Sequence, residues 1–183
     1  LMKNLFIIIF LICLTSKVSA SNKGTIIKNL QNTQNLSFNF EQNINGKLEN
    51  GNCTIEYPKK IFCKYDLKNK KILVSNGRSL VIKTNNSYYI YPLEKTPLNL
   101  ILDKNFLINK IKILEEKVID ENLINFKFLE KNTEINVFFD KKTSNLIGWQ
   151  TVDVYQNLSI TFLYSIAKNK ILEKNLFKLP IKN

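Results

Sequence analysis

The residue types that most often perform catalysis are scarce or poorly placed in this sequence. The 183 residues include no histidine and only three cysteines, which excludes a Ser-His-Asp triad, a Cys-His dyad, an imidazole-ligated zinc site and a four-thiolate site built by this chain alone. The acidic residues are scattered, with no pair at a spacing that fixes two carboxylates on one face for acid–base work. The five glycines form no phosphate-binding loop. We therefore expect no enzyme, no cofactor and no metal site.

Two of the cysteines, Cys53 and Cys63, flank the predicted turn Pro58-Lys59-Lys60. If Tyr57 and Ile61 bracket that turn, the two cysteines share a face of the paired strands but lie diagonally, ~7 to 8 Å apart. That separation is long for an unstrained disulfide, although a bulge would bring the two into register. An oxidising compartment favours a bond between two such thiols. The sequence therefore leaves the Cys53–Cys63 disulfide open.

The chain is basic, with 27 Lys+Arg against 15 Asp+Glu and a formal net charge of +12. Arg78 is the only arginine, whereas proteins that read bases and phosphates rely on the bidentate guanidinium group, so we expect no nucleic-acid binding. The densest basic stretch is interrupted by one acid, Asp66, and contains Lys59, Lys60, Lys64, Lys68, Lys70 and Lys71. Two interpretations stay open: a set of solvated turns, or a docking rim for an acidic partner or an anionic membrane.

The first twenty residues have the pattern of an export signal. Lys3 precedes an apolar run over 5–14, and Val18-Ser19-Ala20 has the small residues of a signal-peptidase site. The apolar run is too short to span a bilayer. We therefore expect residues 1–20 to be a cleaved signal peptide, residues 21–183 to be a single domain and the mature protein to reside in the periplasm.

The elements that must position any site follow from hydrophobic periodicity. Ile26, Ile27 and Leu30 recur at helical spacing, which predicts one amphipathic helix over residues 25–36. From Leu36 onward the period is two, with turn residues between short apolar stretches. Strands are predicted over 36–41, 52–57, 61–66, 71–75, 79–84, 87–91, 110–119, 122–130, 133–140, 146–155 and 158–166. About ten or eleven antiparallel strands in a chain of this length indicate a sandwich or a barrel-like sheet.

One segment interrupts the strand pattern. Thr96 is a suitable N-cap, Pro97 suits the first helical position, and the residues that follow up to Leu102 are nearly all apolar. A helix that is apolar on most faces must be covered on most faces. We therefore expect residues 97–102 to form a short helix packed over the concave face of the sheet.

Several motifs also follow one another in a characteristic order. They are Phe38-Asn39-Phe40-Glu41-Gln42, Gly51, Tyr57-Pro58, Leu73-Val74-Ser75-Asn76-Gly77, the segment Tyr91 to Leu102, Trp149, Asp153 and Phe177-Lys178-Leu179-Pro180. Their order and spacing resemble those of the periplasmic outer-membrane lipoprotein carrier family, LolA, over essentially the whole mature chain. The most specific part is the pattern Tyr-Pro-Leu-x-x-Thr-Pro-Leu that begins at Tyr91.

The resemblance implies a mainly β fold: an incomplete, half-open antiparallel β-barrel with an N-terminal helix and a short lid helix over the concave apolar face. It implies a periplasmic chaperone, expected to be a monomer, that binds the acyl chains of lipoproteins. The expected partners are an inner-membrane lipoprotein-releasing ABC transporter and an outer-membrane acceptor lipoprotein.

Residues two apart in a strand point to the same face, so the first strands and the lid together predict the acyl-chain-binding residues. These are Phe38, Phe40, Ile55, Tyr57, Ile61, Tyr65, Leu98, Ile101 and Leu102. Two positions depart from the family pattern. Tyr57 stands where the family typically has an arginine that latches the lid, and Asn76 replaces an aspartate. Because a phenol donates one hydrogen bond and carries no charge, we expect a lid that is latched either less firmly or by other residues.

Three alternatives remain. A regulatory or lipid-binding domain of the same fold would sense envelope stress through a membrane-protein partner, and we expect it to need a further domain beyond Pro180. An acceptor lipoprotein would need lipidation at Cys13, but the bulky Ile12 stands where a lipoprotein peptidase requires a small residue. The third alternative is a β-domain without a ligand, whose concave apolar face is only core.

Overall fold

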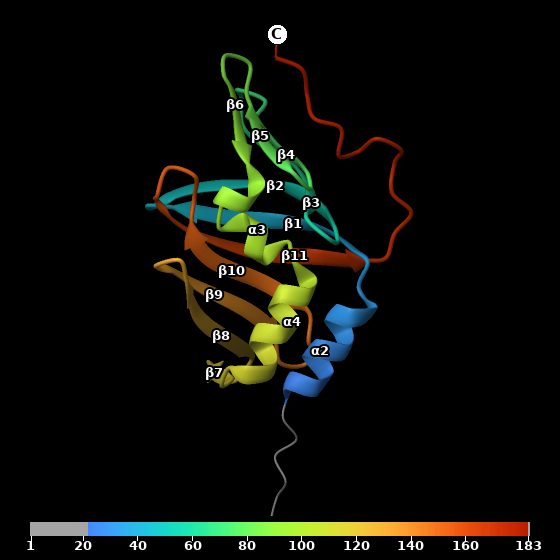
Figure 1. The fold of residues 1–183 in the computed structure, drawn as a ribbon, viewed down its shortest axis with the longest axis vertical. Coiled ribbons are helices and arrows are strands. Elements are labelled where there is room, and N and C mark those ends of the chain that lie inside the picture. The colour runs from blue at the N-terminus through green and yellow to red at the C-terminus, as the bar shows by residue number, and fades with distance from the viewer. Residues whose placement is uncertain (1–21, 183) are drawn as a thin grey trace, which may run out of the picture.

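The computed structural model describes residues 22–182, which form three α-helices and one antiparallel sheet. The strands of the sheet are β1 (Asn35–Ile44), β2 (Lys47–Glu56), β3 (Lys60–Tyr65), β4 (Ile72–Asn76), β5 (Ser79–Lys83), β6 (Tyr88–Pro92), β7 (Lys117–Ile119), β8 (Leu123–Glu130), β9 (Thr133–Asp140), β10 (Leu146–Val152) and β11 (Leu158–Lys168). Their order is β6-β5-β4-β3-β2-β1-β11-β10-β9-β8-β7, so the 11-stranded sheet stays open between its edges β6 and β7. The sheet curls, and β4 to β6 stand upright against β1, β2 and β11 (Figure 1). The predicted half-open antiparallel barrel is confirmed.

Three helices lie over one side of the curled sheet: α2 (Asn22–Asn32), α3 (Leu98–Ile101) and α4 (Lys104–Ile113) (Figure 1). A 3-10 turn, η1 (Leu93–Lys95), leads from β6 into α3. α2 buries Ile26 and Leu30, and it packs beside α4. Beneath these helices, Phe126 and Phe139 from β8 and β9 are fully buried. Burial of such large aromatic side chains stabilises this end of the sheet.

The lid is larger than the sequence predicted. Residues 97–102 were expected to be helical and packed on the concave face, and α3 with the fully buried Ile101 and Leu102 confirms this. The predicted strand over 110–119 is wrong, because α4 continues to Ile113 and β7 begins only at Lys117. The stretch Ile111-Lys112-Ile113 alternates like a strand. However, Leu107, Ile108 and Ile111 bury one helical face.

The boundaries of the first helix and strand also shift. The sequence predicted a helix over 25–36, but α2 ends at Asn32 and Leu36 lies in β1. The expected signal segment, residues 1–20 with Cys13, lies outside the described residues. Within residues 22–182, no helix is both long enough and apolar enough to cross a membrane.

The register between β2 and β3 differs from the predicted one. The turn lies one residue earlier, at Tyr57-Pro58-Lys59, so Lys60 belongs to β3 and pairs with Glu56. Cys53 then lies directly opposite Cys63, and the two form a disulfide with a Cα–Cα distance of 4.1 Å. The diagonal placement predicted from the sequence is therefore wrong. The bond cross-links two neighbouring strands in the interior of the sheet.

The last residues follow the outer face of the upright strands (Figure 1). The side chain of Asn35 holds the start of this segment by two hydrogen bonds to Lys170. Asn35 Nδ2 donates to the carbonyl oxygen of Lys170 at 3.0 Å, and Asn35 Oδ1 accepts from the backbone N–H of Lys170 at 2.9 Å. Lys83 donates from Nζ to the carbonyl oxygen of Ile181 at 2.8 Å. The concave side of β4 to β6 is therefore left to the lid and the site.

Candidate functional site

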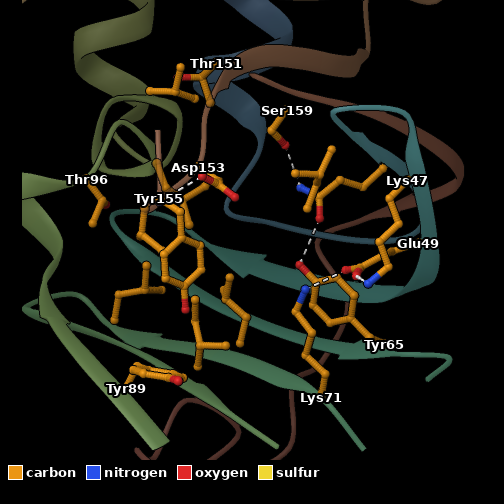
Figure 2. Close-up of a pocket in the computed structure, with 18 of the residues that line it drawn as sticks. Lys47, Glu49, Tyr65, Lys71, Tyr89, Thr96, Thr151, Asp153, Tyr155 and Ser159 are labelled. Carbon is orange, nitrogen blue, oxygen red and sulfur yellow. Dashed lines mark hydrogen bonds and ion pairs between the residues drawn. The ribbon is translucent and has the colours of Figure 1, made fainter. Parts of the chain in front are cut away.

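A cavity of about 310 Å³ lies between the upright strands, α3 and the loop that joins β10 to β11. Figure 2 shows the side chains that surround it. Its apolar wall is formed by Leu67, Leu73, Leu80, Ile82, Leu98, Trp149 and Val154. Leu73 and Ile82 are register partners in β4 and β5, which places both on the concave face. The volume lies at the lower end of the range for small-molecule pockets.

One end of the cavity is charged and polar. Glu49 is only 4% exposed and accepts from Lys71 at 2.5 Å and from Lys47 at 3.0 Å. Burial acts to raise the pKa of Glu49, but the hydrogen bonds from the two lysines outweigh burial and hold the pKa below its usual value. The carboxylate is therefore ionised at neutral pH.

A hydrogen-bond network extends from this ion cluster across the sheet (Figure 2). Tyr65 Oη donates to Gln42 Oε1 at 3.2 Å. Gln42 Nε2 in turn donates to Ser159 Oγ at 3.0 Å and to Thr161 Oγ1 at 3.1 Å. The Lys71 ammonium lies 4.0 Å from the centroid of the Tyr65 ring. Burial, with smaller contributions from Glu49 and Asp153, raises the pKa of Tyr65, so the phenol stays protonated and acts as a donor.

Two exposed tyrosines lie where the cavity opens to solvent. Tyr89 of β6 and Tyr155 of the β10–β11 loop are 46% and 56% exposed. Their rings meet edge to face with centroids 6.4 Å apart. This contact joins an edge strand to a loop from the other half of the sheet. Such aromatic pairs contribute about 0.5 to 1.5 kcal/mol, so the contact is weak enough to part readily.

The lid is fastened to the turn between β2 and β3. The backbone N–H of Lys59 donates to the carbonyl oxygen of Leu102 at 2.9 Å. Lys59 Nζ lies 3.5 Å from Asp103 Oδ2. From the other side, Lys104 donates from Nζ to the carbonyl oxygen of Thr33 at 2.8 Å. The junction between α3 and α4 is thus tied on one side to the β2–β3 turn and on the other to the loop between α2 and β1.

The family model described as "Outer membrane lipoprotein carrier protein LolA" matches residues 31–180. The chain belongs to the LolA family. Among solved structures, an uncharacterized conserved protein from Thermus thermophilus is 9% identical with a TM-score of 0.52, over 88% of this chain and 94% of that chain. The crystal structure of MucB is 9% identical with a TM-score of 0.50, over 90% of this chain and 64% of that chain. A comparison with curated proteins gives no significant match.

A further match is the Pseudomonas aeruginosa MucA/MucB complex, 8% identical with a TM-score of 0.50, over 87% of this chain and 62% of that chain. Identities this low show the fold alone. The LolA fold is a binding and carrier fold. Within residues 22–182, no cluster of three or more Cys, Asp or Glu side chains could hold a metal ion.

The residues predicted to bind acyl chains fall into two groups in this LolA-family chain. Tyr65 and Leu98 line the cavity. The others, apart from Tyr57, lie in the closed core beside the cavity, where each is at most 3% exposed: Phe38, Phe40, Ile55, Ile61, Ile101 and Leu102. Phe38, Phe40, Ile55 and Ile61 lie on one face of β1 to β3, since Phe38 pairs with Cys53, Phe40 with Gly51 and Ile55 with Ile61, and Ile101 and Leu102 of the lid belong to the same buried cluster. Their role in binding stays a prediction.

Tyr57 does not latch the lid by a hydrogen bond. Its Oη is buried and has no hydrogen-bond partner among the described residues, which corrects the expectation that the phenol replaces the family's arginine as a donor. Its ring instead lies 5.7 Å from the Lys104 ammonium. Asn76 closes the β4–β5 turn, accepting at Oδ1 from the N–H groups of Arg78 and Ser79, each at 3.0 Å.

The basic stretch is partly neutralised. Three of its lysines pair with acids: Lys59 with Asp103, Lys60 with Glu56 at 2.6 Å, and Lys71 with Glu49. The remaining three, Lys64, Lys68 and Lys70, are exposed. Neither interpretation of this stretch, solvated turns or a docking rim, is tested by this arrangement.

Gln42, Glu49 and Asp103 were not predicted from the sequence as site residues. A signal was available for each. Gln42 lies two residues after Phe40 in β1 and Glu49 two before Gly51 in β2, so alternation places both on the concave face. Asp103 precedes the helical apolar run of α4 and accepts from Phe106 N–H at 3.0 Å, as an N-cap does.

Proposed function

We propose that this protein is a periplasmic carrier that binds the acyl chains of lipoproteins in the cavity beneath α3. The observation that carries the proposal is a cavity with an apolar wall on the concave face of a half-open sheet, roofed by α3, whose end is held to the β2–β3 turn by one backbone hydrogen bond and one ion pair. Exposing an acyl chain to water costs ~0.8 kcal/mol per CH₂ group. A lipid with several chains therefore needs an apolar container to cross an aqueous compartment.

The cavity must grow to hold more than one long chain. Leu98 lines it, whereas Ile101 and Leu102, on the same lid, are fully buried against the core. Displacement of α3 would add the surface of Phe40 and Ile61 to the wall. The closed core is then the unloaded state, and the predicted acyl-chain-binding residues become accessible when the lid moves.

In the proposed cycle, an inner-membrane lipoprotein-releasing ABC transporter supplies the cargo and an outer-membrane acceptor lipoprotein receives it. Membership of the LolA family supports these partners. The chain needs no chemical step for this role, since burial and release of acyl chains account for loading and delivery.

The test is formation of a soluble complex with an acylated lipoprotein. We expect the purified protein to keep such a lipoprotein in solution as a complex. We expect it not to bind the same lipoprotein when the acylated cysteine is replaced by serine. Ile82→Glu, which puts a charge into the cavity wall, should abolish the complex. Ile90→Glu is the matched control, because Ile90 is 55% exposed on the other face of the neighbouring strand. Equal retention of acylated and unacylated cargo would contradict the proposal.

A second candidate is a regulatory domain that binds a membrane-protein partner. The likeness to MucB, whose complex with MucA has been solved, favours it. A regulator of this kind would bind a protein segment whether or not acyl chains are present. Failure to solubilise acylated cargo, together with capture of a transmembrane regulator's extracytoplasmic peptide, would favour this candidate over the carrier.

A further inference from the structure

The edge strand β6 borders the opening of the cavity. β6 is the first strand in the order of the sheet, so β5 is its one neighbour. Tyr89 of β6 lines the cavity, and its ring meets that of Tyr155 at the opening. In Figure 1, β5 and β6 form the upright end of the sheet, away from α2 and α4. A strand edge and the entrance to the cavity therefore lie at the same place.

The register between β5 and β6 shows which backbone groups of β6 point away from the sheet. The N–H of Leu93 donates to the carbonyl oxygen of Arg78 at 2.8 Å, which fixes one hydrogen-bonded pair of this ladder. Hydrogen-bonded and non-hydrogen-bonded pairs alternate along antiparallel strands. The N–H and C=O groups of Tyr88 and Ile90 therefore point outward. Pro92, the next outward position, has no N–H to offer.

The outward side of β6 is unprotected. Within residues 22–182, no other segment forms a backbone hydrogen bond with the outward groups of Tyr88 and Ile90. Native proteins commonly protect such edges with charged residues, prolines or very short strands. The opposite edge, β7, has three residues and begins with Lys117. β6 has five residues, residues 84–93 carry no charge, and Pro92 protects only its end.

We propose that β6 binds the extended segment that follows the acylated cysteine of a cargo lipoprotein, and that this segment pairs with β6 as an additional strand. The inference rests on the proposed acyl-chain-binding function. With the acyl chains in the cavity, the polypeptide leaves through the opening, where Tyr89 brings β6 alongside it. Strand addition obtains its affinity from main-chain hydrogen bonds. The same edge can therefore hold cargo segments of different sequence.

The test compares three lipopeptides by titration calorimetry on the delipidated protein. All three carry the same S-dioctanoylglyceryl cysteine. The first ends there as an amide, the second continues with the linker Ser-Thr-Val-Ser-Thr-Val, and the third has this linker with every amide nitrogen methylated. We expect the second to bind roughly five- to thirtyfold more tightly than the first, because it gains two or more backbone hydrogen bonds. The third should lose this gain, since methylation removes the donors and blocks strand pairing.

Amide hydrogen exchange locates the contact in the wild-type protein. The second lipopeptide should slow exchange at the N–H groups of Tyr88 and Ile90 at least about fivefold relative to the first lipopeptide. The N–H of Tyr89 already bonds to β5 and should change less. This alternation along β6 distinguishes an added strand from a general stabilisation of the sheet.

Variants at one position separate the backbone from the side chain. Ile90→Pro removes the outward N–H and leaves the hydrogen bonds between β5 and β6 in place. It should erase most of the advantage of the linker and keep the affinity for the first lipopeptide. Ile90→Val and Ile90→Glu retain the N–H and should retain the advantage.

The outcomes separate this inference from the function on which it rests. If the three lipopeptides bind equally, or if exchange at Tyr88 and Ile90 is the same with the first and second, the linker site is overturned while acyl-chain binding stands. Equally tight binding of the linker without its lipid would overturn the assignment to acylated cargo. A dimer that Ile90→Pro abolishes would show that a second copy occupies the edge instead. If no lipopeptide binds, the proposed function fails and this inference fails with it.

Discussion

Asp103 holds the lid in two ways, and two substitutions separate them. Its Oδ1 accepts from Phe106 N–H at 3.0 Å and caps α4, while its Oδ2 lies 3.5 Å from Lys59 Nζ. Loss of an N-cap costs about 0.5 to 2 kcal/mol. The ion pair is worth less than about 1 kcal/mol, because the Lys59 and Asp103 side chains are 36% and 28% exposed and solvent screens them. Asp103→Ala removes both contacts, and Asp103→Asn keeps the capping oxygen.

Amide hydrogen exchange measures the opening of the lid directly. The informative amides are those of Lys59, which donates to Leu102, and Leu107, which donates to the carbonyl of Asp103. Asp103→Ala should speed their exchange roughly five- to thirtyfold, and Asp103→Asn less than about fivefold, since each 1.4 kcal/mol is a factor of ten. High salt should reduce the difference in amide exchange rate between Asp103→Asn and the wild-type protein, because salt screens the ion pair with Lys59.

The control is Asp66→Ala, which removes an exposed acid from the β3–β4 turn. It should leave exchange at Lys59 and Leu107 unchanged. The reasoning is refuted if Asp103→Asn speeds exchange as much as Asp103→Ala, because the cap would then contribute nothing. It is also refuted if neither variant differs from the wild-type protein.

Three further predictions concern the sheet and its polar residues. Tyr57→Phe should leave thermal stability unchanged or raise the free energy of unfolding by up to about 1 kcal/mol, since it removes a buried hydroxyl without a partner; a clear loss of stability would restore a latch role for the phenol. Cys53→Ala with Cys63→Ala should lower the free energy of unfolding by about 2 to 3 kcal/mol in denaturant titrations, and added reductant should then have no further effect. The depressed pKa of Glu49 stabilises the fold above the pKa of the unfolded state, and this stabilisation is lost as pH falls through the lower pKa of the folded state. Glu49→Gln should therefore lower stability at neutral pH and flatten the acid limb of the stability curve, and an unchanged acid limb would exclude Glu49 as its source.

Local patterns predicted the elements of this fold more reliably than the contacts between them. Period-two alternation is a property of each strand, so most strands were predictable, and Thr96, Pro97 and the apolar run after them predicted the helix at α3. The half-open form of the sheet was implied by the resemblance to the LolA family. The helix α4 was not recognised, because Ile111-Lys112-Ile113 satisfies a strand pattern as well as a helical one. The disulfide register depended on a turn that shifted by a single residue.

The candidate site was harder to predict because it is built from contacts between distant residues. Asp103 meets Lys59 only after the sheet has curled, and no local pattern encodes that pairing. Alternation places Glu49 on the concave face, but no local pattern shows that Lys71 and Lys47 pair with it there. Which apolar residues line the cavity and which fill the core depends on how tightly the lid closes.

The central claim is that acyl chains enter the cavity, and Trp149 can report on this directly. It is the only tryptophan in the sequence, it lines the cavity and it is 5% exposed. Bromine atoms quench indole fluorescence only at contact, so a lipid brominated on its acyl chains should quench Trp149, and its unbrominated twin should not. Saturable quenching by the brominated lipid is the predicted result. Binding of the brominated lipid with unchanged Trp149 fluorescence would contradict the account, because the chains would then lie elsewhere.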